Sequence, residues 1–229
     1  MSGFECATND LWVFGYGSLI WNPGFQYSEI QAARIAGFQR SFCIYSTHHR
    51  GNDRQPGLVL GLDRGGLCDG MAFRIPARFR DETLRYLRAR EQISGVYRET
   101  QVRIQLLGQG GETRHAITYI VETAHPSYAG RLPFQHQVKI IRAARGRSGP
   151  NIEYLVNTSM HLRKLSIRDR NIERLTAAAG GLFAASFDKP HVIQRRSACL
   201  VDANTKSVTA GPRLRPPDRR RFLYRNRIG

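Results

Sequence analysis

The sequence contains no apolar run of about 18 or more residues, and no basic segment followed by an apolar one at its start. We therefore expect neither a membrane span nor a secretion signal, and we place the protein in the cytoplasm. Cysteine is scarce and never forms a CxxC pair, which argues against a disulfide framework and against structural zinc. Each cysteine is expected to be a small core or surface residue: Cys6, Cys43, Cys68 and Cys199.

Internal repeats and heptads are also missing, and two common glycine motifs fail in the segment FGYGSLIWNP. A dinucleotide-binding GxGxxG would begin at Gly15 and Gly17, but Ile20 occupies its third glycine position. A serine-hydrolase elbow GxSxG around Ser18 would need glycine at the positions of Tyr16 and Ile20. The sequence therefore predicts neither a nucleotide turn nor a serine nucleophile here.

Acidic residues are few, and the excess of positive charge is concentrated near the end of the chain. The net charge is +17, and residues 184–229 contribute +8 of it, from 11 Lys and Arg against three Asp. This segment has little apolar periodicity and two adjacent prolines. We predict a globular domain over residues 1–180 and a basic, flexible extension over 181–229. Such an extension can bind polyanions non-specifically, which leaves a polyanion-binding protein as an alternative function.

Short segments rich in aromatic and β-branched residues predict strands in the first half of the chain. Two later segments alternate apolar and polar residues, as in strands with one buried face. Together the predicted strands are 12–16, 41–46, 58–62, 68–75, 102–106 and 117–121. Glycines near strand ends predict hairpin turns or barrel corners: Gly61, Gly65, Gly66 and Gly70.

Helices are predicted over residues 80–93, 134–145 and 150–165. Asp81 is the expected N-cap of the first helix, and Pro150 suits the first turn of the last. Because strands come first and helices later, without βαβ alternation, the fold class is α+β. We predict a small mixed or antiparallel β-barrel with helices packed outside it.

The first predicted strand ends at the segment YGSL, Tyr16–Leu19. Gly17 lets the backbone bend there, so that the amides of Gly17, Ser18 and Leu19 can converge on an anion. An ordinary turn explains the glycines equally well, since glycine is the usual residue in strained turns. The residues of this segment leave both interpretations open.

One acidic residue of the first predicted helix faces inward. Glu91 follows Leu84 and Leu87 at the spacing of a single helix face. Burial raises the pKa of a carboxyl group, a property that suits a general base which must later return its proton. The alternative is a structural salt bridge with a nearby arginine: Arg88, Arg90 or Arg98.

Other candidates carry weaker signals. His48 and His49 lack a third ligand at a metal-like spacing, so we expect loop histidines and neither a metal nor a cofactor. Arg50 follows them, and its forked guanidinium suits a carboxylate ligand, although a surface role is commoner in so basic a chain. Three tyrosines either line a pocket or belong to the core: Tyr119, Tyr128 and Tyr154.

Four segments in a fixed order resemble the ChaC-type γ-glutamylcyclotransferases, the glutathione-specific branch of their fold group. They are YGSLIW (16–21), PGLVLGLDRGG (56–66), YLRAREQISGVY (86–97) and GRSGPNIEYLVNTSMHL (146–162). The resemblance runs from residue 11 to about residue 175. It implies an enzyme that cleaves glutathione to 5-oxoproline and cysteinylglycine, by attack of the α-amine on the γ-carbonyl. Action on other γ-glutamyl peptides or amines is the neighbouring alternative.

The resemblance also implies roles for individual residues. Glu91 is similar to the family's catalytic glutamate, which takes a proton from the α-ammonium and passes it to the leaving nitrogen. Tyr16–Leu19 looks like the loop that binds the γ-glutamyl group, with its amides on the α-carboxylate or on the developing oxyanion. Tyr16 as a ring wall and Ser18 as a hydroxyl ligand are further options, and Arg50 would clamp the glycine carboxylate of glutathione.

Overall fold

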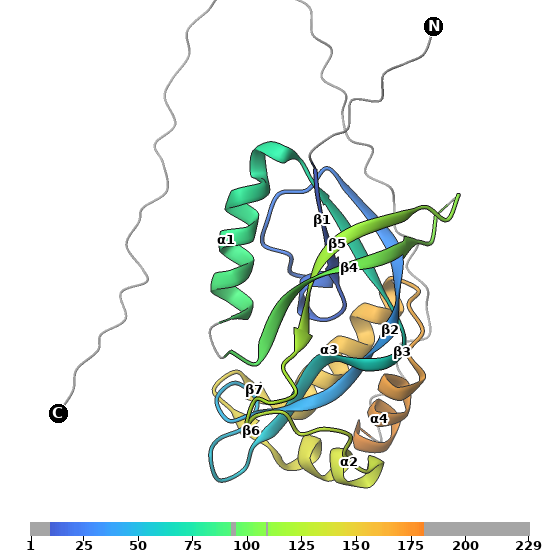
Figure 1. Ribbon diagram of the computed structural model, residues 1–229. Helices are drawn as coiled ribbons and strands as arrows, with labels where there is room; N and C mark the ends of the chain where they lie inside the picture. Colours follow the sequence, from blue (N-terminus) through green and yellow to red (C-terminus); the bar gives the residue numbers. More distant parts are fainter. Residues whose placement is uncertain (1–9, 93–94, 109, 181–229) are drawn as a thin grey trace, which may run out of the picture. The chain divides into compact units, whose positions relative to one another are not determined.

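The structure, a computed structural model, describes residues 10–92, 95–108 and 110–180 (Figure 1). The predicted extension over 181–229 lies outside these residues, as do Cys6 and Cys199. Five of the described strands form a closed barrel in the order β1-β3-β2-β4-β5, and the short strands β6 and β7 form a separate two-stranded sheet. The bounds of the barrel strands are β1 Leu11–Gly15, β2 Glu29–Ser46, β3 Gly57–Ile75, β4 Tyr97–Leu106 and β5 Thr113–Val121.

The first strand closes the barrel. β1 pairs antiparallel with β3 along its whole length and parallel with β5 through Val13 and Ile117. The Thr118 hydroxyl of β5 donates to the Phe14 carbonyl over 2.9 Å, which adds a side-chain link to this short seam. Alternate side chains fill the interior, and Phe14 and Phe73 are fully buried there. The predicted mixed barrel is confirmed.

The strand boundaries differ from the prediction. The expected strands 58–62 and 68–75 are parts of the single strand β3, and 41–46 is only the end of β2. Gly65 and Gly66 have positive φ angles of 101° and 74°, next to a register shift in β2. These glycines are therefore bends within a continuous strand, where an extra residue increases curvature, and not hairpin turns. The barrel-corner alternative was the correct one.

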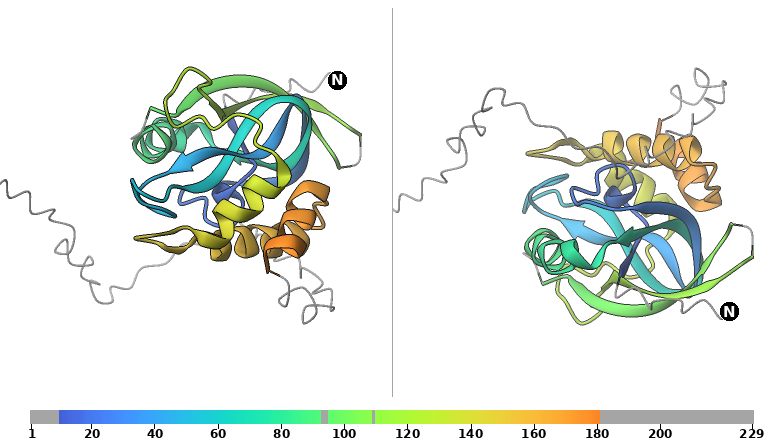
Figure 2. Two further views of the ribbon diagram at one scale, coloured as in Figure 1. Left: turned by 90° about the horizontal axis from the view of Figure 1, so that it is seen from below. Right: turned by 90° about the horizontal axis from the view of Figure 1, so that it is seen from above.

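The helices lie outside the barrel (Figures 1 and 2). α1 stands alone on one flank, while α2, α3 and α4 pack against one another on another flank. Apolar side chains such as Leu87, Ile141 and Leu155 cover the inner helix faces and are fully buried. Helix bounds are α1 Arg80–Glu91, α2 Phe134–Ala143, α3 Asn151–Lys164 and α4 Arg170–Gly180. Shorter elements are η1 Ser18–Ile20, η2 Ala77–Phe79, β6 Arg145–Gly146 and β7 Gly149–Pro150.

Two predictions about helix ends are corrected, and one helix was missed. The turn η2 runs directly into α1, so Phe79 is the N-cap and Asp81 lies inside the first turn, where its charge favours the helix dipole. Pro150 precedes α3 in an extended conformation, with ψ of 145°, and the helix starts at Asn151. α4 was not predicted at all. No helix in the described ranges is long and apolar enough to cross a membrane.

Candidate active site

The segment Tyr16–Leu19 follows β1 directly and includes the first two residues of η1. The Ile20 amide donates to the Gly17 carbonyl and the Asn22 amide to the Ser18 carbonyl, each over 2.9 Å. The amides of Gly17, Ser18 and Leu19 lie at the N-terminal end of this helical turn. Amides at that end have no hydrogen-bond partner inside the helix. A Cβ atom at Gly17 would meet only Leu60 Cδ1, at 3.7 Å, within 4 Å. The fold therefore leaves space beside this turn.

Glu91 is the last residue of α1 and faces inward, as its spacing predicted. Leu87, one turn earlier, is fully buried, and the Glu91 side chain is only 16% exposed. Burial raises the pKa of Glu91 above its ordinary value of 4.5, while the nearby Arg90 guanidinium opposes that rise. Arg90 Nε lies 3.1 Å from Glu91 Oε1. The carboxylate is thus paired, yet it retains a raised affinity for a proton.

Arg90 links the end of α1 to the turn. Its Nη2 donates to the Ser18 hydroxyl oxygen over 2.8 Å, and its Nη1 donates to the Asn22 carbonyl over 2.6 Å. The Ser18 oxygen accepts this bond, so the hydroxyl proton is left to donate to a ligand. The same guanidinium contacts Glu91, and it therefore brings Ser18 and Glu91 to one site.

Of the three arginines that the sequence left open as salt-bridge partners of Glu91, the structure pairs it with Arg90. Arg88 instead binds Glu99 through two hydrogen bonds, and Arg98 pairs with Glu122. The helix spacing alone did not distinguish these arginines, because the partners that Arg88 and Arg98 bind, Glu99 and Glu122, are brought near them only by the fold.

Four buried or half-buried tyrosines lie near Glu91. Burial is the main cause that raises the pKa of each of them, and the negative charge of Glu91 raises it further, which requires proximity. These tyrosines are Tyr16, Tyr97, Tyr119 and Tyr154. Tyr119 and Tyr154 are thus close to the site, whereas Tyr128 donates its hydroxyl to Asp63. Apolar ring surface near a carboxylate disfavours its ionised form, which agrees with the raised pKa of Glu91.

Arg50 lies over the Tyr154 ring, and the pKa of Tyr154 responds to the charges of both Arg50 and Glu91. Burial raises the pKa of Tyr154 to about 12; Glu91 adds to this rise and Arg50 opposes it. The Arg50 guanidinium is 5.6 Å from the centroid of this ring, and it donates to the Pro150 carbonyl over 3.1 Å. Its ion pair with Glu153 is long, at 3.8 Å, so the guanidinium retains donors for another carboxylate.

His48 and His49 lie elsewhere in the same loop. His49 Nδ1 is 3.1 Å from the Ser148 hydroxyl, and His48 Nε2 is 3.3 Å from Arg147. Both contacts tie the loop to the connection between β6 and β7. Within the described ranges, no group of three or more His, Cys, Asp or Glu side chains has the geometry of a metal site.

Two residues that support the site were missed. Asn151 is fully buried, accepts from the Leu58 amide over 2.6 Å and donates to the Leu58 carbonyl over 2.7 Å, which fixes the start of α3 to β3. Arg40 is buried in β2 and donates to the Tyr16 carbonyl over 2.6 Å. Asn151 follows Pro150 and so looks like an ordinary helix start in the sequence. Arg40 is one arginine among many, and no sequence pattern distinguishes it.

Comparison with known proteins identifies a family to which the chain is similar. A family model described as ChaC-like protein matches residues 11–180. The chain is 36% identical over 177 residues to the "Glutathione-specific gamma-glutamylcyclotransferase" of Escherichia coli (strain K12), covering 77% of this chain and 76% of that one. It is 35% identical to "Glutathione-specific gamma-glutamylcyclotransferase 1" of Mus musculus, covering 77% and 81% of the two chains.

Solved structures agree on the fold. The crystal structure of a yeast γ-glutamyl cyclotransferase specific to glutathione has a TM-score of 0.67 and 24% identity, and the match covers 75% of this chain and 96% of that chain. The segment that the family model matches takes in the barrel, α1 and the three packed helices. On that extent of similarity, the chain belongs to the ChaC-like protein family.

Proposed function

We propose that this protein is a γ-glutamylcyclotransferase that converts glutathione to 5-oxoproline and cysteinylglycine. Family membership and the names of the bacterial and mouse relatives support this activity. The structural observation that carries it is Glu91, an inward carboxylate with a raised pKa that shares Arg90 with the turn Tyr16–Leu19. A cytoplasmic location, and non-specific polyanion contact through residues 181–229, stay predictions from the sequence.

Glu91 is the proton carrier in this proposal. The ionised carboxylate takes a proton from the substrate α-ammonium, and the freed amine attacks the γ-carbonyl carbon to form the lactam bond. The old amide bond then breaks as Glu91 returns this proton to the departing cysteinylglycine nitrogen; the second proton that the ring nitrogen loses follows the same route, so the leaving group departs as an ammonium and the carboxylate is restored. Because the nucleophile is part of the substrate, the effective molarity is on the order of 10⁵ M or more, so folding the substrate correctly is a large part of catalysis.

The turn and Arg50 are the proposed binding groups. The amides of Gly17, Ser18 and Leu19, together with the Ser18 hydroxyl, bind the α-carboxylate or the oxyanion that develops at the γ-carbonyl. Tyr16 contributes a buried ring wall. Arg50, which lies over the Tyr154 ring near Glu91, binds the glycine carboxylate of glutathione.

The activity is tested by incubating the purified protein with glutathione and measuring 5-oxoproline and cysteinylglycine in equal amounts. γ-Glutamylcysteine and γ-glutamylalanine serve as competing substrates. Faster turnover of either competitor than of glutathione contradicts the glutathione assignment and favours the broader γ-glutamyl class. A protein that forms no 5-oxoproline from any of them contradicts the proposed activity itself.

The Arg50 assignment has its own test. Arg50→Met should raise KM for glutathione by about tenfold, the scale of one charge-assisted hydrogen bond, and should leave KM for γ-glutamylcysteine nearly unchanged. Arg54→Met, on an exposed residue of the same loop, is the matched control. An equal rise of KM for both substrates would place Arg50 outside the glycine subsite.

A further inference from the structure

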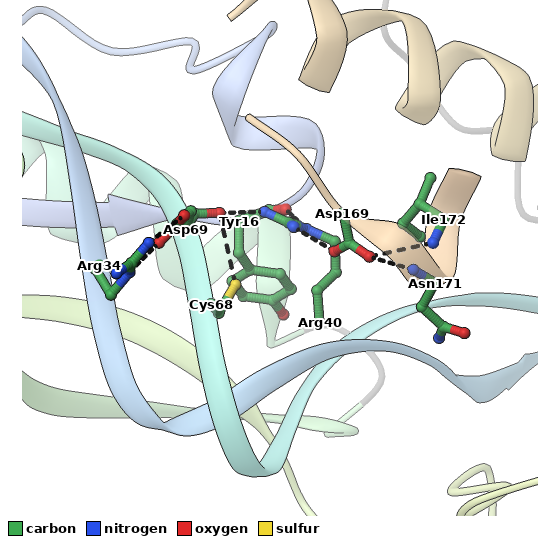
Figure 3. A network of polar contacts seen from close by, with 8 residues as sticks. All are labelled: Tyr16, Arg34, Arg40, Cys68, Asp69, Asp169, Asn171 and Ile172. Carbon is green, nitrogen blue, oxygen red and sulfur yellow. Dashed lines mark hydrogen bonds and ion pairs between the residues drawn. The ribbon is translucent and has the colours of Figure 1, made fainter. Parts of the chain in front are cut away.

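The buried guanidinium of Arg40 holds three separate parts of the chain together (Figure 3). Its Nε donates to the Tyr16 carbonyl and its Nη2 to the Asp69 carbonyl, each over 2.6 Å, and its Nη1 pairs with Asp169 Oδ2 at 2.7 Å. The Arg40 side chain is only 2% exposed. All of its nitrogens therefore bind acceptors, a geometry that the single ammonium of lysine cannot reproduce.

The contact with Tyr16 fixes more than one atom. The Tyr16 carbonyl and the Gly17 amide belong to the same peptide group, which is planar and trans. A carbonyl held toward Arg40 therefore turns the Gly17 N–H away from the buried network. Gly17 is the first of the turn amides assigned to the substrate, so Arg40 sets the direction of that donor without touching the substrate.

Asp169 anchors this arrangement at a distant part of the chain. Its second oxygen, Oδ1, accepts from the Asn171 and Ile172 amides, each over 3.1 Å, as an N-cap does at the start of α4. One carboxylate thus begins α4 and balances the Arg40 charge (Figure 3). The position of the turn is in this way linked to the packing of α4.

We propose that Arg40 is a positioning residue for the cyclotransferase reaction, anchored by Asp169, and that it orients the Tyr16–Gly17 peptide to bind the γ-glutamyl group. This inference rests on the proposed function. A purely structural tie between β2 and α4 is the competing explanation, and it predicts changes in stability alone.

The test uses Arg40→Lys, which keeps the charge beside Asp169 but loses the forked contacts. Measured at a temperature where each variant is folded, KM for glutathione should rise by about tenfold or more, with a smaller change in kcat. Asp169→Asn keeps an N-cap and an acceptor for Arg40, so its rise in KM should lie between the wild type and Arg40→Lys. Arg34→Lys is the control, because Arg34 binds the Asp69 carboxylate in the same network without contacting Tyr16.

Hydrogen exchange of the peptide covering residues 16–20 provides a readout that needs no substrate. Faster exchange of this peptide in Arg40→Lys, but not in Arg34→Lys, supports the role of Arg40 in orienting the turn. This support does not depend on activity, because a wild-type protein that failed to turn over glutathione would contradict only the proposed function. Unchanged KM and unchanged exchange in a folded Arg40→Lys protein overturn the proposal. If Arg40→Lys does not fold, Asp169→Asn decides by the same two measurements.

Discussion

Replacing Glu91 with glutamine separates a proton carrier from a structural ion pair. Glutamine keeps the size of the side chain and can still accept a hydrogen bond from Arg90, but it cannot take a proton from the α-ammonium. Turnover should fall by about 10²-fold or more, the usual scale of general-base catalysis, which corresponds to about 2.7 kcal/mol in the activation barrier.

The structure predicts a small effect of the same change on stability. Arg90 keeps its bonds to Ser18, Asn22 and Tyr86, so its charge is not left without partners. Burial already disfavours the ionised form of Glu91, and a neutral amide removes that cost. We therefore expect the free energy of unfolding to change by about 1 kcal/mol or less, and Tm by no more than about 4 °C.

The assay measures 5-oxoproline formation and Tm on one preparation. Asp81→Asn is the matched control, because it removes an exposed carboxylate from the same helix; it should leave turnover unchanged and lower stability only by the loss of one favourable charge in the first turn, about 0.3–1 kcal/mol. A folded Glu91→Gln protein that turns over glutathione at nearly the parent rate would refute the assignment. A large loss of Tm with activity retained would show that the ion pair is structural.

Three further changes test the site and the chain end. Arg90→Gln removes the charge that lowers the pKa of Glu91, so this pKa should rise. On acidification, the kcat/KM of the variant should therefore fall at a higher pH than that of the wild type, and an acid limb at the same pH in both proteins would contradict Glu91 as the titrating base. Gly17→Val should raise KM for glutathione by about tenfold or more, because a β-branched side chain crowds the amides of the turn. Tm should stay nearly unchanged, because an added Cβ atom would meet only Leu60 Cδ1, at 3.7 Å. Gly17→Ala is the milder control, and normal kinetics in the valine variant would argue against substrate binding by these amides. Removal of residues 184–229 should keep turnover within about twofold, since the family match ends at residue 180, and lost activity in a truncated protein that still folds would contradict the predicted domain boundary.

The parts predicted correctly from the sequence are those with strong local patterns. Alternation identified β4 and β5, and the spacing of Leu84, Leu87 and Glu91 gave the inward direction of the carboxylate. The first two thirds of β2 were missed because residues 29–40 contain alanine, glutamine and glycine where a typical strand has β-branched residues. Its conformation is set by pairing with β3 on one side and β4 on the other, which is tertiary information.

The supporting contacts of the site could not be predicted for a related reason. Arg40 and Asp169 are separated by 129 positions, and neither lies in a segment with a distinctive pattern. α4 follows α3 closely and ends in an alanine-rich stretch, and no helix was predicted there. Long-range pairs of charged residues need a known fold before a single partner can be chosen.

The closure of the barrel by its first strand has a consequence for the order of folding. β1 gains its seam with β5 through a bond between residues 104 positions apart, and the turn after β1 gains its anchor from Asp169 still later in the chain. Contacts between such distant residues form slowly, because loop closure precedes any gain from them. A nascent chain that ends after α1 already contains Glu91 and the whole turn, yet it lacks both the seam and the anchor. Synthesis must therefore pass the start of α4 before the site can assemble.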